Sequence, residues 1–222
     1  MSGTSIDPKE FVGVVRPCLE AQDLNGLIQQ VRARWTPQQV RSLLHCRCHD
    51  TKKIALLTLS WVGQAGCVEE LAKALRDPDA MMNGMAEHAL WSIWFRLGTE
   101  EANHELCRGS KALERQELEC AVRHFTRAAE IDPTFAEAYN QRAIAHFLSE
   151  RMDQSLKDCT VAVKLMPCHF GAYAGMGHCH LHRGELREAL TAYERALAIN
   201  PHMECVAEAV DELKDKLAAG GE

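Results

Sequence analysis

Small and apolar residues recur at a regular interval through the second half of the chain. Prolines stand at Pro133, Pro167 and Pro201. Three columns of small residues precede them: Gly109, Ala143 and Gly177; Ala121, Ser155 and Ala189; Ala128, Ala162 and Ala196. One column holds mostly larger side chains: Phe125, Cys159 and Tyr193. This 34-residue period predicts three similar structural units in succession.

Each unit is predicted to be a pair of helices joined by a short turn. The small columns let neighbouring helices approach closely, and the larger side chain fills the gap between them. The proline ends the second helix because it lacks an N–H group. We therefore expect Ala128, Ala162 and Ala196 to be buried at helix contacts. Thr134 followed by Glu137 predicts a capping box at the start of the next helix.

This pattern resembles the tetratricopeptide repeat family, whose 34-residue unit has aromatic, small and proline positions in these columns. Three units fit, at residues 102–135, 136–169 and 170–203, although the second has Cys159 where the family prefers an aromatic residue. Residues 204–222 are expected to form an amphipathic capping helix and a short tail.

The first half of the chain repeats with a different, 31-residue period. Its apolar sets have helical spacing and are Leu24, Ile28 and Val31, then Ala55, Leu59 and Val62, then Ala86, Leu90 and Ile93. Residues 24–98 resemble short HEAT-like repeats of the lyase-associated type. A helix over 8–21, capped by Asp7 and Pro8 and kinked or ended early by Pro17, is expected to precede them in a first domain, residues 1–101.

These patterns predict an all-α solenoid: HEAT-like helix pairs, then three tetratricopeptide-like pairs, then the capping helix. Hydrophobic residues are 46% of the chain and charged residues 25%, as in a folded globular protein. The chain has ten cysteines, and its first residues have no apolar signal core. We therefore expect a cytoplasmic protein with unpaired thiols.

The resemblance implies a non-catalytic scaffold or adaptor that binds a peptide segment or partner protein on the concave face of the array. No cofactor and no membrane are expected. Positions that face the groove in this family fall on the partner-binding candidates Asn103, Leu106, Ser110, Asn140, Gln141, Ile144, Phe147, Ala174, His178 and His182.

Some family members clamp an acidic C-terminal carboxylate with Lys, Asn and Arg at five of the groove positions. This chain has Leu106, Ser110, Gln141, Gly171 and Gly175 there. The resemblance therefore argues against a clamp for acidic tails, and the groove is expected to be mostly neutral.

Two other functions stay open. The stretch 32–53 is a candidate for binding nucleic acid or another anion through Arg32, Arg34, Arg41, Arg47, Lys52 and Lys53. A metal-binding or enzyme-accessory role would use His45–Asp50, where Cys46 and Cys48 are flanked by histidines. No second cysteine pair completes a zinc site, and no nucleophile elbow or phosphate loop occurs, so we assign no metal site and no catalytic residue.

Overall fold

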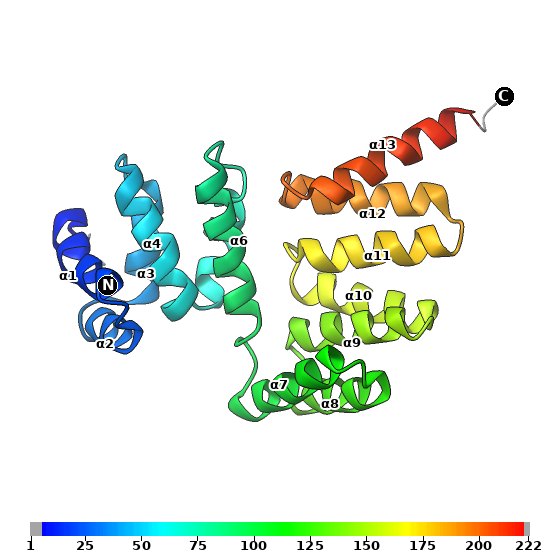
Figure 1. The fold of residues 1–222 in the computed structure, drawn as a ribbon, viewed down its shortest axis with the longest axis horizontal. Helices are drawn as coiled ribbons and strands as arrows, with labels where there is room; N and C mark the ends of the chain where they lie inside the picture. The colour runs from blue at the N-terminus through cyan, green and yellow to red at the C-terminus, as the bar shows by residue number, and fades with distance from the viewer. Residues whose placement is uncertain (1–5, 220–222) are drawn as a thin grey trace. The chain divides into compact units, whose positions relative to one another are not determined.

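The computed structural model describes residues 6–219, and within them it contains thirteen α-helices and no strand (Figure 1). The all-α prediction is therefore confirmed. The chain divides into two compact units, one ending at Trp94 and one beginning at Phe95. The domain boundary expected between residues 101 and 102 falls within the first helix of the second unit, and the division into three domains stays a prediction.

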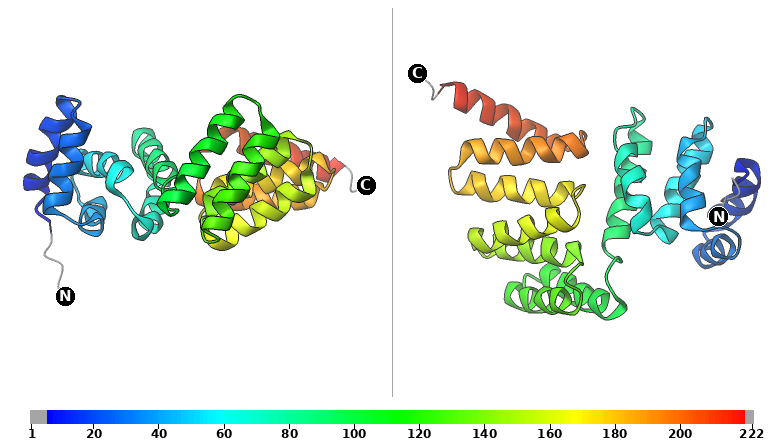
Figure 2. Two further views of the ribbon diagram at one scale, coloured as in Figure 1. Left: turned by 90° about the horizontal axis from the view of Figure 1, so that it is seen from below. Right: turned by 180° about the vertical axis from the view of Figure 1, so that it is seen from behind.

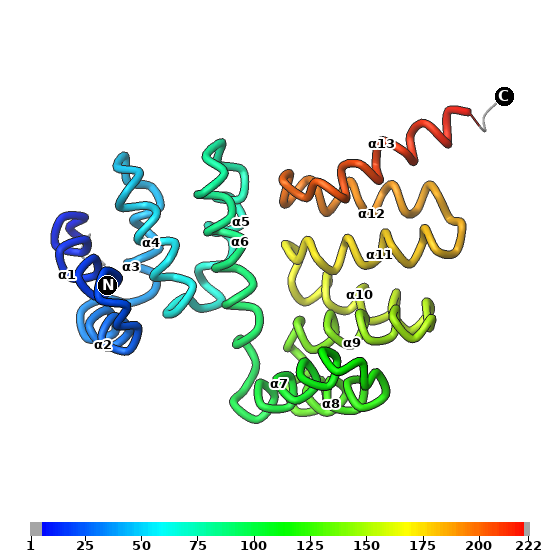
Figure 3. The backbone as a smooth tube through the Cα atoms, viewed as in Figure 1, coloured from blue at the N-terminus to red at the C-terminus, as the bar shows by residue number. Residues whose placement is uncertain are grey.

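The first unit holds six helices and two short 3-10 turns, Leu43–His45 and Ala65–Cys67. The helices are α1 (Pro8–Glu20), α2 (Leu24–Arg34), α3 (Pro37–Ser42), α4 (His49–Val62), α5 (Val68–Ala74) and α6 (Ala80–Trp94). The tube in Figure 3 shows α5 packed beside α6. The buried side chains at its centre include Phe11, Leu27, Leu56, Leu71 and Leu90.

Both ends of α1 agree with the helix predicted over residues 8–21. The Asp7 carboxylate accepts a hydrogen bond from the Lys9 backbone N–H (3.0 Å), and Pro8 is the first helical residue. Of the two effects expected at Pro17, an early end is excluded, because α1 continues through it to Glu20, and a kink stays a prediction. A proline in a helix removes only one backbone hydrogen bond, and the buried Phe11 and Val15 hold this helix in place.

The second unit repeats with the predicted 34-residue period (Figures 1 and 2). Its helices are α7 (Glu100–Glu114), α8 (Leu118–Ile131), α9 (Ala136–Leu148), α10 (Met152–Leu165), α11 (Phe170–His182), α12 (Leu186–Ile199) and α13 (Glu204–Ala219). The helices α8, α10 and α12 begin and end at equivalent residues, and so do α9 and α11. The last helix, α13, begins one repeat length after α11, where the first helix of a fourth unit would begin.

The turn within each helix pair has the same backbone conformation. Gln116, Glu150 and Gly184, which occupy the same place in successive units, all have a positive φ, of 60°, 59° and 74°. The next residue in each turn donates its N–H to a carbonyl five residues earlier at 2.9 Å; the pairs are Glu117 and Ala112, Arg151 and His146, and Glu185 and His180. This is the Schellman ending of a helix, in which the left-handed residue is usually glycine.

The repeating columns pack as the sequence predicts. Ala128, Ala162 and Ala196 have no exposed surface. A Cβ atom added at Gly109 would collide with the ring of Phe125, and one added at Gly177 would collide with the ring of Tyr193. The small column therefore makes room for the aromatic column of the same unit.

The capping box predicted from Thr134 and Glu137 is wrong. Phe135 is the N-cap of α9, and the Thr134 hydroxyl donates instead to Asp132 (2.7 Å). Glu137 is fully buried and points into the array, where it bonds to other side chains. The amphipathic helix expected after Pro201 is confirmed as α13, which buries Val206, Val210 and Leu213.

Candidate functional site

A cavity of about 180 Å³ opens among α9, α10 and α11 in the second unit. Most of its lining is apolar. The residues that line it are Asn140, Ala143, Ile144, Phe147, Leu148, Ser155, Cys159, Gly171, Gly175 and His178. Four of the predicted groove residues meet here: Asn140, Ile144, Phe147 and His178.

The cavity is present because the middle pair lacks an aromatic ring. Phe125 and Tyr193 fill the corresponding space in the first and third pairs, each against a glycine. The middle pair has Cys159 and Ala143 in those two places, and both line the cavity. A thiol occupies far less volume than an aromatic ring, so the space beside it stays open. The departure from the family pattern at Cys159 is therefore the sequence feature that indicates this pocket.

Apolar and aromatic side chains form the rim. Ile144 is 39% exposed and Leu148 is 54% exposed, which is unusual for large aliphatic residues on a helix that has a buried face. The Phe147 ring lies 6.2 Å from the ring of His178 and 6.4 Å from that of His182. The two histidines, predicted to share a helix face, thus both contact the aromatic residue of the preceding pair.

His178 is held by the third pair. The Tyr193 hydroxyl and Nδ1 of His178 are 2.7 Å apart, and burial raises the pKa of Tyr193 to about 12. The tyrosine therefore keeps its proton and donates it to Nδ1. Desolvation lowers the pKa of His178, although the residue as a whole is exposed. In the neutral imidazole that accepts from Tyr193 at Nδ1, the proton is on Nε2.

Asn140 and Gln141 take part in a buried hydrogen-bond network centred on Glu137. Both amide nitrogens donate to Glu137 Oε1, at 3.2 Å and 2.7 Å. His169 Nδ1 accepts from the Ala172 backbone N–H (3.1 Å), so its Nε2–H donates to Glu137 Oε2 (2.8 Å). The network joins α9 to the start of α11, and it commits the amide nitrogens of Asn140 and Gln141 to the fold.

The remaining groove candidates lie apart from the cavity. The Asn103 amide donates to the Gly98 carbonyl (2.8 Å), and the Ser110 hydroxyl donates to that of Leu106 (3.0 Å). Leu106 and Ala174 are buried in the cores of the first and third pairs. The partner-binding role of the whole set stays a prediction.

The six basic residues of the stretch 32–53 lie on α2, on α3, in the segment before α4 and in the first turns of α4. Arg41 donates to the Gly66 carbonyl, and Lys53 forms an ion pair with Asp79 (2.9 Å). Arg34 bonds to Gln30 on its own helix, whereas Arg32 and Arg47 are exposed. Two of the six cations therefore already have partners elsewhere in the fold, and anion binding by this stretch stays a prediction.

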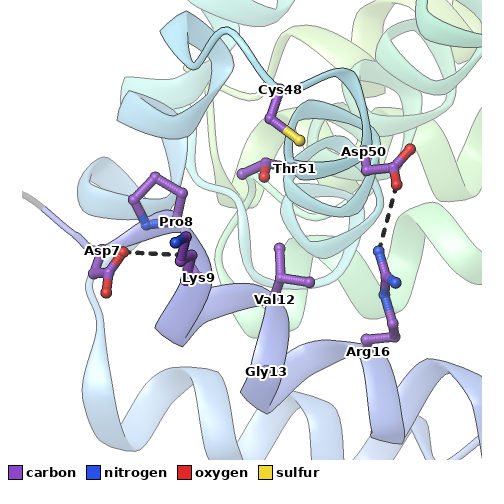
Figure 4. Close-up of a pocket in the computed structure, with 9 residues that line it drawn as sticks. All are labelled: Asp7, Pro8, Lys9, Val12, Gly13, Arg16, Cys48, Asp50 and Thr51. Atoms are coloured by element: carbon purple, nitrogen blue, oxygen red, sulfur yellow. Dashed lines mark hydrogen bonds and ion pairs between the residues drawn. The ribbon is translucent and has the colours of Figure 1, made fainter.

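A second cavity, of about 560 Å³, lies between α1 and the start of α4 (Figure 4). The residues around it are Asp7, Pro8, Lys9, Val12, Gly13, Arg16, Cys48, Asp50 and Thr51. Cys48 is exposed at the N-cap of α4, and its hydrogen bond with the Thr51 side chain lowers the pKa of the thiol. Arg16 pairs with Asp50 at 3.6 Å. Among residues 6–219, no cluster of three or more His, Cys, Asp or Glu side chains is placed to hold a metal ion.

Comparison with known proteins points to one family. A sequence profile of the tetratricopeptide repeat matches residues 171–203. A TPR repeat-containing protein of Rhizobium etli is 31% identical over 146 residues, which cover 66% of this chain and 71% of that protein. The chain belongs to the tetratricopeptide repeat family. The HEAT-like character of residues 24–98 stays a prediction.

Other tetratricopeptide repeat proteins match over a smaller share of their own length. Small glutamine-rich tetratricopeptide repeat-containing protein 2 of Saccharomyces cerevisiae is 35% identical over 92 residues, and the chain spans only 27% of its length. The Hsp70-Hsp90 organizing protein of Triticum aestivum is 29% identical over 118 residues, with 20% of its length covered.

Solved structures share the fold over about half of this chain. The first TPR of Spaghetti (RPAP3), bound to the HSP90 peptide SRMEEVD, superposes with a TM-score of 0.53 at 24% identity, covering 54% of this chain and 94% of that one. The Sgt2 TPR domain from Aspergillus fumigatus gives 0.53 at 21% identity, with 55% and 83% covered. None of the helices in residues 6–219 has both the length and the apolar character needed to cross a bilayer.

Proposed function

We propose that the tetratricopeptide half of this chain is a non-catalytic adaptor that binds an extended segment of a partner protein along α7, α9 and α11. The observation that carries this proposal is the apolar cavity beside Cys159, with the exposed Ile144 and Leu148 at its rim. Large apolar side chains are seldom left exposed around a preformed cavity unless they contact something. The solved structure bound to an HSP90 peptide is an example of this fold with a peptide ligand.

The acidic tail in that structure is not the ligand that we propose for this chain. Leu106 and Ser110 stand at two of the positions where clamp-forming members carry cations or amides, and Leu106 is buried in the core. Gly171 and Gly175 have no side chain to offer a carboxylate. The cytoplasmic location expected from the sequence is part of the proposal, and the high cysteine content of the chain, ten residues, fits a reducing compartment.

Ile144 and His178 are better probes of the groove than Asn140 and Gln141. Replacement of either amide would remove one of the three donors to the buried Glu137 carboxylate, and a loss of binding could then reflect a loss of stability. Ile144→Ser and His178→Ser alter the rim and leave the Glu137 network intact. The control pair is Arg41→Glu with Arg47→Glu, in the first unit.

The test is affinity capture from the native cell extract with the unchanged chain and these two paired variants, followed by a binding measurement with the purified partner. We expect the Ile144 and His178 pair to lose the partner and the Arg41 and Arg47 pair to retain it. The opposite result would place the binding site in the first half of the chain and contradict the proposal.

A further inference from the structure

The cavity beside Cys159 has the size and lining of a pocket for one large apolar side chain. Its volume is about 180 Å³, and an apolar cavity of roughly 150 Å³ is large enough for a benzene ring. Gly175 keeps it open, since a Cβ atom there would lie 3.1 Å from the Cys159 sulfur. Burial raises the pKa of Cys159 to about 12, so this wall of the pocket is an uncharged thiol.

Among the described residues, the family's groove positions of the three helix pairs carry no Lys or Arg. Of the two carboxylates at these positions, Glu114 is exposed, whereas Glu137 is buried in the hydrogen-bond network with His169. A segment lying in this groove would meet no cation there to attract an acidic side chain.

The acidic character continues on α13. Because α13 begins one repeat length after α11, the positions equivalent to Ala174, His178 and Leu181 are Glu208, Glu212 and Asp215. All three carboxylates are exposed, and Lys216, which pairs with Glu212 at 3.7 Å, is the one cation at the corresponding positions in the described part of this helix.

From the pocket and the charges together we infer that the groove recognises a segment with one large apolar side chain flanked by lysine or arginine residues. This inference rests on the proposed function and names the chemistry of its partner. The apolar side chain, Leu, Ile, Met or Phe, fills the cavity beside Cys159. The basic residues lie toward α13, where the carboxylates attract them and speed association. The specificity is thus opposite in charge to that of a groove that binds acidic tails.

Selection of peptides from a random library of linear 12-residue sequences displayed on phage, with the full 222-residue chain as bait, tests the inference directly. We expect the selected sequences to share a large apolar residue within four positions of at least two Lys or Arg, and to be poor in Asp and Glu. The affinities of synthetic, fluorescein-labelled copies are then measured by anisotropy. Their binding should weaken as NaCl is raised.

Two groups of variants separate the pocket from the charges. Ala143→Gly with Cys159→Tyr recreates the Gly177 and Tyr193 pair and fills the cavity, and we expect about tenfold weaker binding, as for loss of an anchor side chain. Ile144→Ser removes part of the rim without a core change and should also weaken binding.

Glu208→Lys with Glu212→Lys should weaken binding several-fold and reduce its salt dependence. Glu188→Lys, a single charge reversal on the exposed surface of α12, is the control and should have no effect.

Each outcome decides between the two levels of proposal. A library that yields no binding peptide contradicts the proposed function as well as this inference. Peptides that bind and depend on Ile144, but are acidic or carry no basic residues, contradict this inference alone. Binding that is unchanged when the cavity is filled by Cys159→Tyr, in a variant whose circular dichroism matches the parent's, also overturns it.

Discussion

The single cysteine at position 159 shows how one residue alters a repeating structure. In the first and third helix pairs an aromatic ring lies against a glycine, and the fit is close enough to exclude a Cβ atom. In the middle pair both partners differ, since Ala143 carries the methyl group and Cys159 lacks the ring. A change at one position without the other would give either a collision or a larger cavity.

Substitution of Gly177 tests this packing. We expect Gly177→Ala to lower the free energy of unfolding by about 1–3 kcal/mol, because the added methyl group collides with the Tyr193 ring. Gly84→Ala is the matched control in α6, where an added Cβ meets nothing within 4 Å. That control should raise the free energy of unfolding by about 0.5–1 kcal/mol, because alanine loses less conformational entropy than glycine when the helix folds. Urea denaturation measures both, and equal effects would show that the contact with Tyr193 is not tight.

His178 should make stability depend on pH. Burial lowers its pKa below the ordinary value of 6.5, and it does the same to His146. The unfolded chain therefore binds protons at a higher pH than the folded chain, so stability falls as pH decreases through 6.5 and levels off below the folded pKa. The decline in melting temperature from pH 8 to pH 5.5 should be smaller in His178→Gln than in the parent. An equal decline in both would show that His178 titrates normally.

The helices of the second unit could be predicted from the sequence because the positions of close helix contact require small residues, and these recur every 34 residues. The 34-residue spacing located α8 to α12, and the burial of Ala128, Ala162 and Ala196 follows from it. Capping was harder to predict, since Thr134 and Glu137 have the right spacing for a capping box but Glu137 is buried with His169. That partner lies 32 residues away, and local spacing carries no information about it.

The candidate site was only partly predictable for a similar reason. The family positions identified Ile144, Phe147 and His178, which do meet at the cavity. They also pointed to Leu106 and Ala174, which are core residues here. Whether a side chain at a groove position is exposed depends on the residues packed against it from the next helix pair.

The turns within the helix pairs provide an element-scale prediction. Gln116 and Glu150 adopt the left-handed conformation that Gly184 adopts in the third pair. A non-glycine residue there is strained by about 1–2 kcal/mol, part of which is offset by the greater flexibility of glycine in the unfolded chain. We therefore expect Glu150→Gly to stabilise the protein by about 0.5–1 kcal/mol.

The reverse change, Gly184→Ala, should destabilise by about 1 kcal/mol, although the site has open space around it. Thermal unfolding monitored by circular dichroism measures both changes. A loss of stability in Glu150→Gly would mean that the glutamate side chain contributes more than its backbone strain costs.

At the scale of the whole molecule, the two compact units have separate buried cores. We expect calorimetry to show two unfolding transitions. Leu71→Ala, in the core of the first unit, should lower one of them through a loss of about 2–5 kcal/mol, and Gly177→Ala should lower only the other. If both variants shift one common transition, the units unfold as a single cooperative block.

The hydrogen bonds around the middle helix pair also bear on how the array would lose its structure. In a one-dimensional nearest-neighbour model of repeat proteins, each repeat has an intrinsic folding free energy, and each interface between adjacent repeats has a coupling free energy. The middle unit has a weak intrinsic term, because of its cavity, but strong junctions on both sides. The Arg142 guanidinium donates both to Asp158 of its own pair (2.7 Å) and to the Thr126 hydroxyl of the first pair (3.1 Å). On the other side, Glu137 bonds to His169 at the start of the third pair. We therefore expect fraying to begin at the ends of the array, and the pair that carries the pocket to be among the last to open.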